Sequence, residues 1–292
     1  MTQEQLAESF EEQRSRLRAV AYRLLGSTGE ADDAVQEAWL RLSRTDADEI
    51  ENLGGWLTTV VARVSLNMLR SRRTRREEPL GPYIPEPILD RPDETDPEHE
   101  ALLGDSVGLA LLVVLETLTP AERLAYVLHD MFGIPFEEVA PIVERSPQAT
   151  RQLASRARRR IRDEAPAPDG DVANQWQIVD AFLAAARDGN FEALLEILDP
   201  DVVLRADFGP VGGSREVRGA ELVMGQALAY ARVGLVIRPV LVNGLPGAVT
   251  TLEGEIFSVG AVTIRNGKIV ALDFLADPER LGRLDLSVLE AA

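Results

Sequence analysis

The sequence predicts a multidomain chain in which two all-α domains precede a C-terminal α+β domain. Three observations lead to this prediction. The chain has 292 residues, which is enough for two or three domains that each bury a core. Up to residue 163, apolar side chains recur at helical three- and four-residue steps, whereas short strand-like runs fill the C-terminal part. Two segments rich in proline and acidic residues separate these blocks.

The expected boundaries follow these changes in composition. Residues 77–100 contain six prolines and show no sustained periodicity, so we expect an extended linker that is too polar to pack a core. The sequence APAPDGDV marks a second, shorter joint. The predicted parts are a helical domain at 1–76, a linker at 77–100, a second helical domain at 101–163, a short linker at 164–172 and an α+β domain at 173–292.

Three helices are expected in the first domain. The first carries Phe10, Leu17 and Leu24 on one face and ends at a Gly-Ser-Thr-Gly sequence. The second begins near Ala31 and has acidic residues in its first turn, where the helix dipole favours them. The third spans residues 55–72 and runs into a cluster of arginines.

A helix-turn-helix is predicted where the second domain reads FEEVAPIVERSPQATRQLASRARRR. The first helix ends at Glu144-Arg145, Ser146 caps the next one, and Pro147 occupies its first position. Pro141 predicts a kink or a restart in the first helix. On the second helix, we expect inward positions at Ala149, Leu153, Ala157 and Ile161. The expected exposed residues are Gln148, Thr150, Arg151, Gln152, Ser155, Arg156, Arg158 and Arg159.

The C-terminal part is expected to combine helices with a meander of antiparallel strands, which makes an α+β unit. Asn243-Gly244 and Asn266-Gly267 are predicted hairpin turns. The expected helices are 173–188, 191–198 and 220–231, and the expected strands are 202–204, 235–242, 248–252, 256–264 and 269–275.

Net charge alone argues against a nucleic-acid partner. The formal charge is −17, but five arginines lie between Arg70 and Arg76 and six between Arg151 and Arg162. Arginine suits bidentate contacts with phosphates and guanine edges, so these clusters predict two local contact surfaces for DNA. The sequence has no cysteine, no run long enough to span a membrane and no N-terminal secretion signal, so we expect a cytoplasmic protein without membrane association.

The sequence around Ala31-Asp32-Asp33-Ala34-Val35-Gln36-Glu37-Ala38-Trp39-Leu40-Arg41 resembles region 2 of the extracytoplasmic-function sigma factors, which belong to the sigma-70 family. This resemblance implies that the segment docks on core RNA polymerase and that residues 56–72 form the helix for the promoter −10 element. It also implies capture of a flipped base by the loop 46–53. The implied polymerase-binding residues are Asp33, Gln36, Glu37 and Arg41, and the implied −10 contacts are Arg63, Arg70, Arg72 and Arg73.

The helix-turn-helix, with Leu118 to Arg123 before it, resembles region 4 of the same family. The resemblance implies that its second helix reads the promoter −35 element from the major groove. Glutamine can pair with adenine and arginine with guanine. The implied DNA-binding residues are Gln148, Thr150, Arg151, Gln152, Ser155, Arg156 and Arg159.

Two further segments point to sigma factors that carry a C-terminal SnoaL-like, or NTF2-like, cone domain. Tyr83-Ile84-Pro85-Glu86-Pro87 is similar to a W-L-P-E-P element in their linker, while a D-G-G-G-K loop and an N-P-D-K-L tail correspond to the segments from Asp207 and from Asp277-Pro278. The resemblance implies that Tyr83, Pro85, Glu86, Pro87, Asp207, Asp277 and Pro278 are regulatory. We expect this domain to restrain the two sigma domains. Whether it also binds a small ligand stays open at this point.

Catalysis is not expected in this domain. It has no histidine or cysteine, so acid–base work would depend on carboxylates such as Asp273 and Glu255, for which structural roles are the default. We therefore predict no enzyme, no cofactor and no metal. Two alternatives to a sigma factor stay open at this point: a ligand-sensing helix-turn-helix regulator that does not join polymerase, and a cone-fold enzyme attached to a DNA-binding module.

Overall fold

A computed structural model describes residues 3–46, 50–74, 81–92, 99, 102, 108–165, 167–231 and 233–289. The chain forms two compact units. The helical unit comprises Met1–Glu78, Glu100–Gly104 and Val114–Glu164, and the sheet unit comprises Pro79–His99, Asp105–Val113 and Ala165–Ala292. This division differs from the expected boundaries, because most of the linker belongs to the sheet unit.

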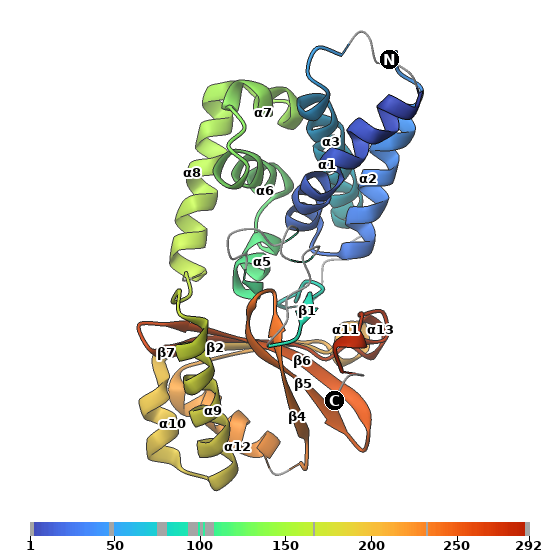
Figure 1. The fold of residues 1–292 in the computed structure, drawn as a ribbon. Helices are drawn as coiled ribbons and strands as arrows, with labels where there is room; N and C mark the ends of the chain where they lie inside the picture. The colour runs from blue at the N-terminus through green and yellow to red at the C-terminus, as the bar shows by residue number, and fades with distance from the viewer. Residues whose placement is uncertain are drawn as a thin grey trace. The chain divides into compact units, whose positions relative to one another are not determined.

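Three helices form the first part of the helical unit, as predicted: α1 (Gln3–Leu25), α2 (Thr28–Leu42) and α3 (Leu53–Thr74) (Figure 1). The periodic apolar residues are buried between them, including Leu17 and Leu24 of α1 and Val61 of α3. Helix α2 begins three residues before the expected start, because the Ser27 side chain accepts a hydrogen bond from the Glu30 backbone N–H at 3.3 Å.

The second part of the helical unit contains the predicted helix-turn-helix, formed by α7 (Phe136–Val143) and α8 (Pro147–Glu164). It follows α5 (Leu109–Glu116), α6 (Pro120–Tyr126) and the π-helical turn η2 (Val127–Met131). Helix α7 runs through Pro141 as one helix and is not restarted there. Its end is set by Glu144, which adopts a left-handed conformation with φ 58°.

Two buried arginines join the parts of the helical unit. Arg123 of α6 forms an ion pair with Glu116 at 2.7 Å, and its Nε donates to the Arg23 carbonyl oxygen at 3.2 Å. The Arg23 guanidinium lies over the Phe132 ring, 5.0 Å from the centroid. Burial lowers the pKa of Arg23 to about 10. These contacts tie the end of α1 to the segment that precedes the helix-turn-helix.

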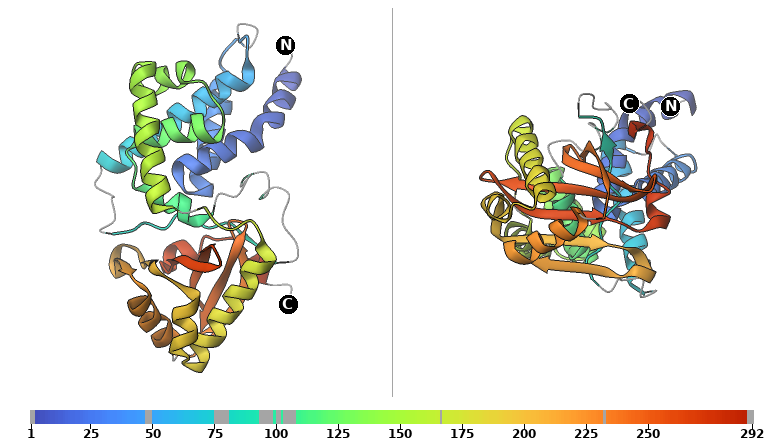
Figure 2. Two further views of the ribbon diagram at one scale, coloured as in Figure 1. Left: turned by 90° about the vertical axis from the view of Figure 1, so that its left-hand side faces the viewer. Right: turned by 90° about the horizontal axis from the view of Figure 1, so that it is seen from below.

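The sheet unit has the predicted α+β composition. Its strands are β1 (Leu89–Asp90), β2 (Leu198–Asp207), β3 (Ser214–Arg218), β4 (Val236–Val242), β5 (Leu245–Leu252), β6 (Glu255–Arg265) and β7 (Lys268–Leu275), in the order β1-β4-β5-β6-β7-β2-β3. Neighbouring strands are antiparallel except β2 and β7, which are parallel. The strands can also be followed from below (Figure 2).

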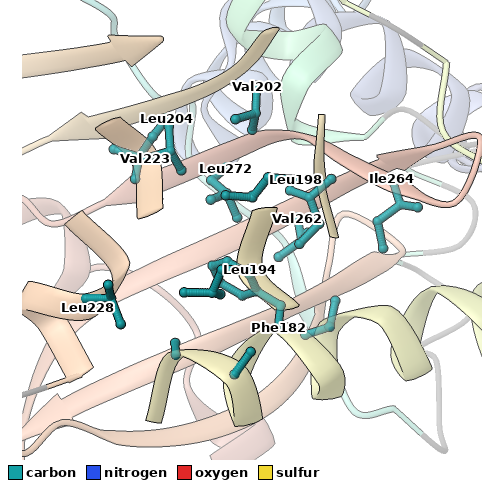
Figure 3. Close-up of a cluster of buried hydrophobic side chains, with 14 of the residues drawn as sticks. Phe182, Leu194, Leu198, Val202, Leu204, Val223, Leu228, Val262, Ile264 and Leu272 are labelled. Atoms are coloured by element: carbon teal, nitrogen blue, oxygen red, sulfur yellow. The ribbon is translucent and has the colours of Figure 1, made fainter. Parts of the chain in front are cut away.

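Helices α9 (Val172–Asp188), α10 (Phe191–Ile197) and α12 (Ala220–Ala231) lie on one side of this sheet (Figure 1). Two short helices, α11 (Gly209–Gly212) and α13 (Pro278–Leu281), and the 3₁₀ turn η3 (Ser287–Leu289) complete the unit. Phe182 of α9, Leu194 of α10 and Leu228 of α12 meet Val262, Ile264 and Leu272 of the sheet in one apolar core (Figure 3). The prediction of an α+β domain is therefore confirmed.

Both predicted hairpin turns are present. Asn243 and Gly244 have φ values of 51° and 74°, and Asn266 and Gly267 have values of 53° and 72°. Two consecutive positive φ angles are typical of the type I′ turns that Asn-Gly favours. Two strands were not predicted: β3, within the segment interpreted as a loop, and β1, within the expected linker.

Candidate functional site

Helix α2 presents the residues expected to bind polymerase on one exposed side. Asp33 and Gln36 are exposed, and Glu37 forms an ion pair with Arg41 at 2.8 Å. Leu40 lies on the same side, since positions 33, 36, 37 and 40 follow helical spacing, and 40% of its surface is exposed. The result is an acidic surface with an apolar residue in it. Sequence reasoning missed Leu40, although it stands within the motif.

Helix α3 has a second exposed side, which contains Arg63, Asn67 and Arg70. The opposite side, with Val61 and Leu69, is buried. Arg63 and Arg70 are therefore accessible, and their contact with the −10 element stays a prediction. Asn67 lies between them at helical spacing and was not considered before.

Arg72 corrects the interpretation of the first arginine cluster. Its two terminal nitrogens donate to the Leu25 carbonyl oxygen at 3.0 and 3.1 Å, and its guanidinium forms an ion pair with Glu30. These bonds hold the end of α3 against α1 and α2, so this guanidinium has a structural role that was not foreseen, and a DNA contact by Arg72 stays a prediction. The side chain of Arg73 and part of the loop 46–53 lie outside the described residues.

The exposed side of α8 was predicted correctly except at one position. Thr150 is fully buried with Ala154, Ala157 and Ile161, and its hydroxyl donates to the Ser146 carbonyl oxygen at 3.0 Å. It cannot reach a base edge, so its place among the DNA-binding residues was wrong. The helix is rotated from the expected orientation, because Ala154 and not Leu153 lies deepest in the core. The exposed candidates are Gln148, Arg151, Gln152, Ser155, Arg156 and Arg159.

Acidic residues of the same unit hold several arginines of α8. Arg156 pairs with Glu122 at 2.7 Å, and Arg158 pairs with Asp130 at 2.8 Å. Burial of Glu122 opposes its ionisation, but hydrogen bonds from Arg156 and Thr119 outweigh this effect and lower the pKa of Glu122. Arg159 has no acidic partner among the described residues and is exposed. This arginine is therefore available for a phosphate contact.

In the sheet unit, residues 83–90 of the expected linker are docked on the C-terminal α+β domain. The Ile84 backbone N–H donates to Asp207 Oδ2 at 3.1 Å, and the Ile84 carbonyl oxygen accepts from Arg280. Arg280 also donates to Asp207 Oδ2 at 2.8 Å and lies over the Tyr83 ring, 4.3 Å from its centroid. Ile84, Pro85 and Pro87 are buried and Glu86 is half-buried. The expectation that this segment is too polar to pack was wrong.

Asp207 and Asp277 organise this contact. Asp207 Oδ1 accepts from the Gly209 backbone N–H at 3.0 Å, and Asp277 caps α13 by accepting from the Glu279 backbone N–H at 3.0 Å. Pro278 occupies the first turn of α13. This short helix places Arg280 beside Asp207. All three segments of the resemblance, at Tyr83, Asp207 and Asp277, thus meet at one place.

Asn243 provides a second attachment for the linker. Its Oδ1 accepts from the Ile88 backbone N–H at 3.1 Å, and its own backbone N–H donates to the Ile88 carbonyl oxygen at 2.8 Å. Strand β1 then pairs with β4. Sequence reasoning missed Asn243 and Arg280. Arg280 had a signal, because it occupies the position of the lysine in the family's tail motif, whereas Asn243 was interpreted only as a turn residue.

The carboxylates considered for catalysis do not converge. Asp273 is fully buried and pairs with Arg205 at 2.9 Å; burial raises the pKa of Asp273, and Arg205 opposes that effect. Glu253 and Glu255 lie at the turn between β5 and β6. Within the described residues no acidic or histidine cluster could hold a metal ion, and no helix is long and apolar enough to cross a membrane. His129 is half-buried, and its ring stacks on Phe136.

Comparisons with known proteins agree with the two helical parts. A family model described as Sigma-70 region 2 matches residues 10–75, and a second, described as Sigma-70 region 4, matches residues 108–161. The chain is therefore a sigma factor of the sigma-70 type.

Relatives place it more closely. The chain is 38% identical over 286 residues to the ECF RNA polymerase sigma factor SigJ of Mycobacterium tuberculosis, covering 93% of this chain and 91% of that protein. It is 35% identical to the probable ECF RNA polymerase sigma factor SigI of the same species, covering 91% of each chain. The crystal structure of M. tuberculosis SigJ matches with a TM-score of 0.78 and 36% identity, over 94% of this chain and 98% of that one.

The chain belongs to the extracytoplasmic-function sigma factors of RNA polymerase. This family membership confirms the predicted function and sets aside both the regulator that acts without polymerase and the cone-fold enzyme. A sigma factor binds core RNA polymerase and promoter DNA and is not an enzyme.

Proposed function

We propose that three surfaces of this cytoplasmic sigma factor divide its work. The side of α2 with Asp33, Gln36 and Leu40 binds core polymerase. The side of α3 with Arg63 and Arg70 contacts the −10 element, and the exposed side of α8 reads the −35 element. Exposure of these residues beside buried cores supports the proposal, since arginine on a recognition helix suits base edges and phosphates.

We further propose that the sheet unit regulates initiation through the linker that joins regions 2 and 4. The observation that carries this proposal is the carboxylate of Asp207, which holds both the Ile84 N–H and the Arg280 guanidinium. While residues 83–90 are docked, they cannot lengthen the connection between the two promoter-binding regions. Docking therefore restrains the rearrangement needed on a promoter. No small ligand is part of this proposal, because apolar side chains such as Phe182 and Leu272 form a packed core.

The test is run-off transcription with purified core polymerase and the Asp207→Asn variant. An amide keeps the size of the side chain but removes the charge that Arg280 pairs with. Hydrogen bonds to charged groups contribute about 1.5–3 kcal/mol, so losing this one should raise transcript yield by about tenfold or more. Asp201→Asn is the matched control, since Asp201 lies in the same strand and is exposed. Equal yields from both variants and the parent protein would reject regulation by linker docking.

A further inference from the structure

Three side chains at the start of the helix-turn-helix form a stack. The ring centroids of His129 and Phe136 are 3.6 Å apart, with an interplanar angle of 26°. The Arg151 guanidinium also lies over the Phe136 ring, 5.5 Å from its centroid. The residues come from η2, α7 and α8, respectively. We call this set the His129–Phe136–Arg151 stack. It links the base-reading helix to the two elements before it.

The middle of the stack is fixed by packing. Phe136 is only 8% exposed and forms a small core with Ala125 of α6 and Ala154 of α8. His129 is held as well, since its Nδ1 lies 2.9 Å from the Ile134 carbonyl oxygen. A carbonyl oxygen can only accept, so Nδ1 carries the proton and donates. Arg151 thus lies on an aromatic ring that has little freedom to move.

Glu137 fixes the remaining freedom of Arg151. One of its carboxylate oxygens lies 2.6 Å from Arg151 Nη2. A guanidinium has five N–H donors in a planar fork, so a carboxylate at one end leaves further donors for another partner. The Arg151 side chain is 53% exposed and lies in the first turns of α8, on the exposed side with Gln148 and Gln152. Side chains at this end of a recognition helix contact base edges.

The pair differs from the other ion pairs that α8 makes with α6 and η2. Glu122 and Asp130, the partners of Arg156 and Arg158, have side chains only 15% and 21% exposed. Glu137 is 63% exposed, like its arginine partner. Exposed ion pairs contribute little to folding, about 0.2–1 kcal/mol. The Glu137–Arg151 pair therefore contributes little to stability. Its effect on the orientation of the Arg151 guanidinium is the more important one.

We propose that Glu137 is a positioning residue for sequence reading: it holds Arg151 on Phe136 so that the free donors of the guanidinium meet a guanine in the −35 element. The inference rests on the proposed role of α8. A bidentate contact to guanine O6 and N7 needs the plane of the fork to be set, and an arginine that is oriented before binding loses less entropy when it forms this contact.

The test measures base preference with holoenzyme. Core polymerase with the full-length protein is given promoters in which each −35 position is varied, and run-off yield is recorded for each base. We expect Arg151→Ala to remove a guanine preference at one position. Glu137→Gln should weaken the same preference at least about fivefold, because a well-placed arginine–guanine pair discriminates by roughly 5- to 150-fold. Glu138→Gln, a change at the neighbouring exposed residue, should leave it intact.

Salt dependence supplies a second measurement, which distinguishes a change in base reading from a general change in DNA affinity. Glu137 contacts no phosphate in this proposal, so Glu137→Gln should keep the slope of log affinity against log salt. If the variant raises binding at every base equally, Glu137 only masks a positive charge and the inference is wrong. If Arg151→Ala alters base preference and Glu137→Gln does not, the inference fails while the role of α8 stands. If neither variant alters any base preference, base reading by Arg151 fails too.

Discussion

At the scale of single residues, the sheet unit contains a buried ion pair, and burying its two charges costs free energy on folding. Asp273 of β7 and Arg205 of β2 are opposite each other in the parallel pairing, and Asp273 Oδ2 has no hydrogen-bond partner among the described residues. Burial raises the pKa of Asp273, and Arg205 opposes that effect. The folded protein therefore binds a proton on the Asp273 carboxyl group more tightly than the unfolded chain does. The stabilisation that comes from this proton is present at low pH and is lost as pH rises through the raised pKa of Asp273.

This pair predicts opposite outcomes for single and double substitutions. Arg205→Met leaves a buried carboxylate without its partner and should lower the free energy of unfolding by about 3–5 kcal/mol near neutral pH. Arg205→Met with Asp273→Leu removes both charges and should restore stability to the parent level or above it, since apolar side chains can replace a buried ion pair. Urea unfolding followed by circular dichroism measures both. A double variant no more stable than the single one would contradict this account.

At the scale of secondary structure, local sequence patterns predicted the positions of helices, strands and turns better than they predicted which side of a helix is buried. The two Asn-Gly turns and five of the seven strands followed from turn chemistry and strand-like runs. Thr150 was misplaced because Ala149 and Leu153 match the helical spacing of the later apolar residues about as well as Thr150 and Ala154 do, so two rotations of the helix fit the pattern almost equally. Strand β1 was missed because its partner β4 lies about 150 residues further along the chain, and no local signal reports such pairing.

The same limit applies to the candidate site. The surfaces on α2, α3 and α8 are each formed by one helix, so a resemblance over one short segment was enough to propose residues for each of them. The structural role of Arg72 was not foreseen because its partners, Leu25 and Glu30, belong to other helices. The docked linker depends on Asp207, Asn243 and Arg280, which only the tertiary fold brings to it.

The two hairpin turns offer a matched test of linker docking. Asn243→Ala and Asn266→Ala each place alanine at a positive φ, 51° or 53°, so each should weaken its turn by a similar amount, about 1 kcal/mol. Only Asn243 also binds Ile88. Limited proteolysis should therefore cut near residues 83–90 much faster in Asn243→Ala than in Asn266→Ala. Equal cleavage rates in the two variants would mean that the side chain of Asn243 does not hold the linker.

At the scale of the whole molecule, charge is arranged locally against an acidic background. A net charge of −17 repels DNA at long range, and the screening length at physiological salt is only about 8 Å. Contact with phosphates must therefore depend on which arginines lie at the interface. Most arginines of α8 have acidic partners, whereas Arg159 has none among the described residues.

Two substitutions with the same effect on net charge separate local contact from overall field. Arg159→Ala should remove one phosphate contact, so the slope of log affinity against log salt for holoenzyme on promoter DNA should become shallower by about 0.9. Arg265→Ala also removes one positive charge, but from an exposed position at the end of β6 in the sheet unit, and should leave the slope unchanged. Affinity would be measured from low to physiological salt. Equal changes of slope in both variants would show that DNA responds to the total charge of the protein; a change in Arg159→Ala alone would place the contact on α8.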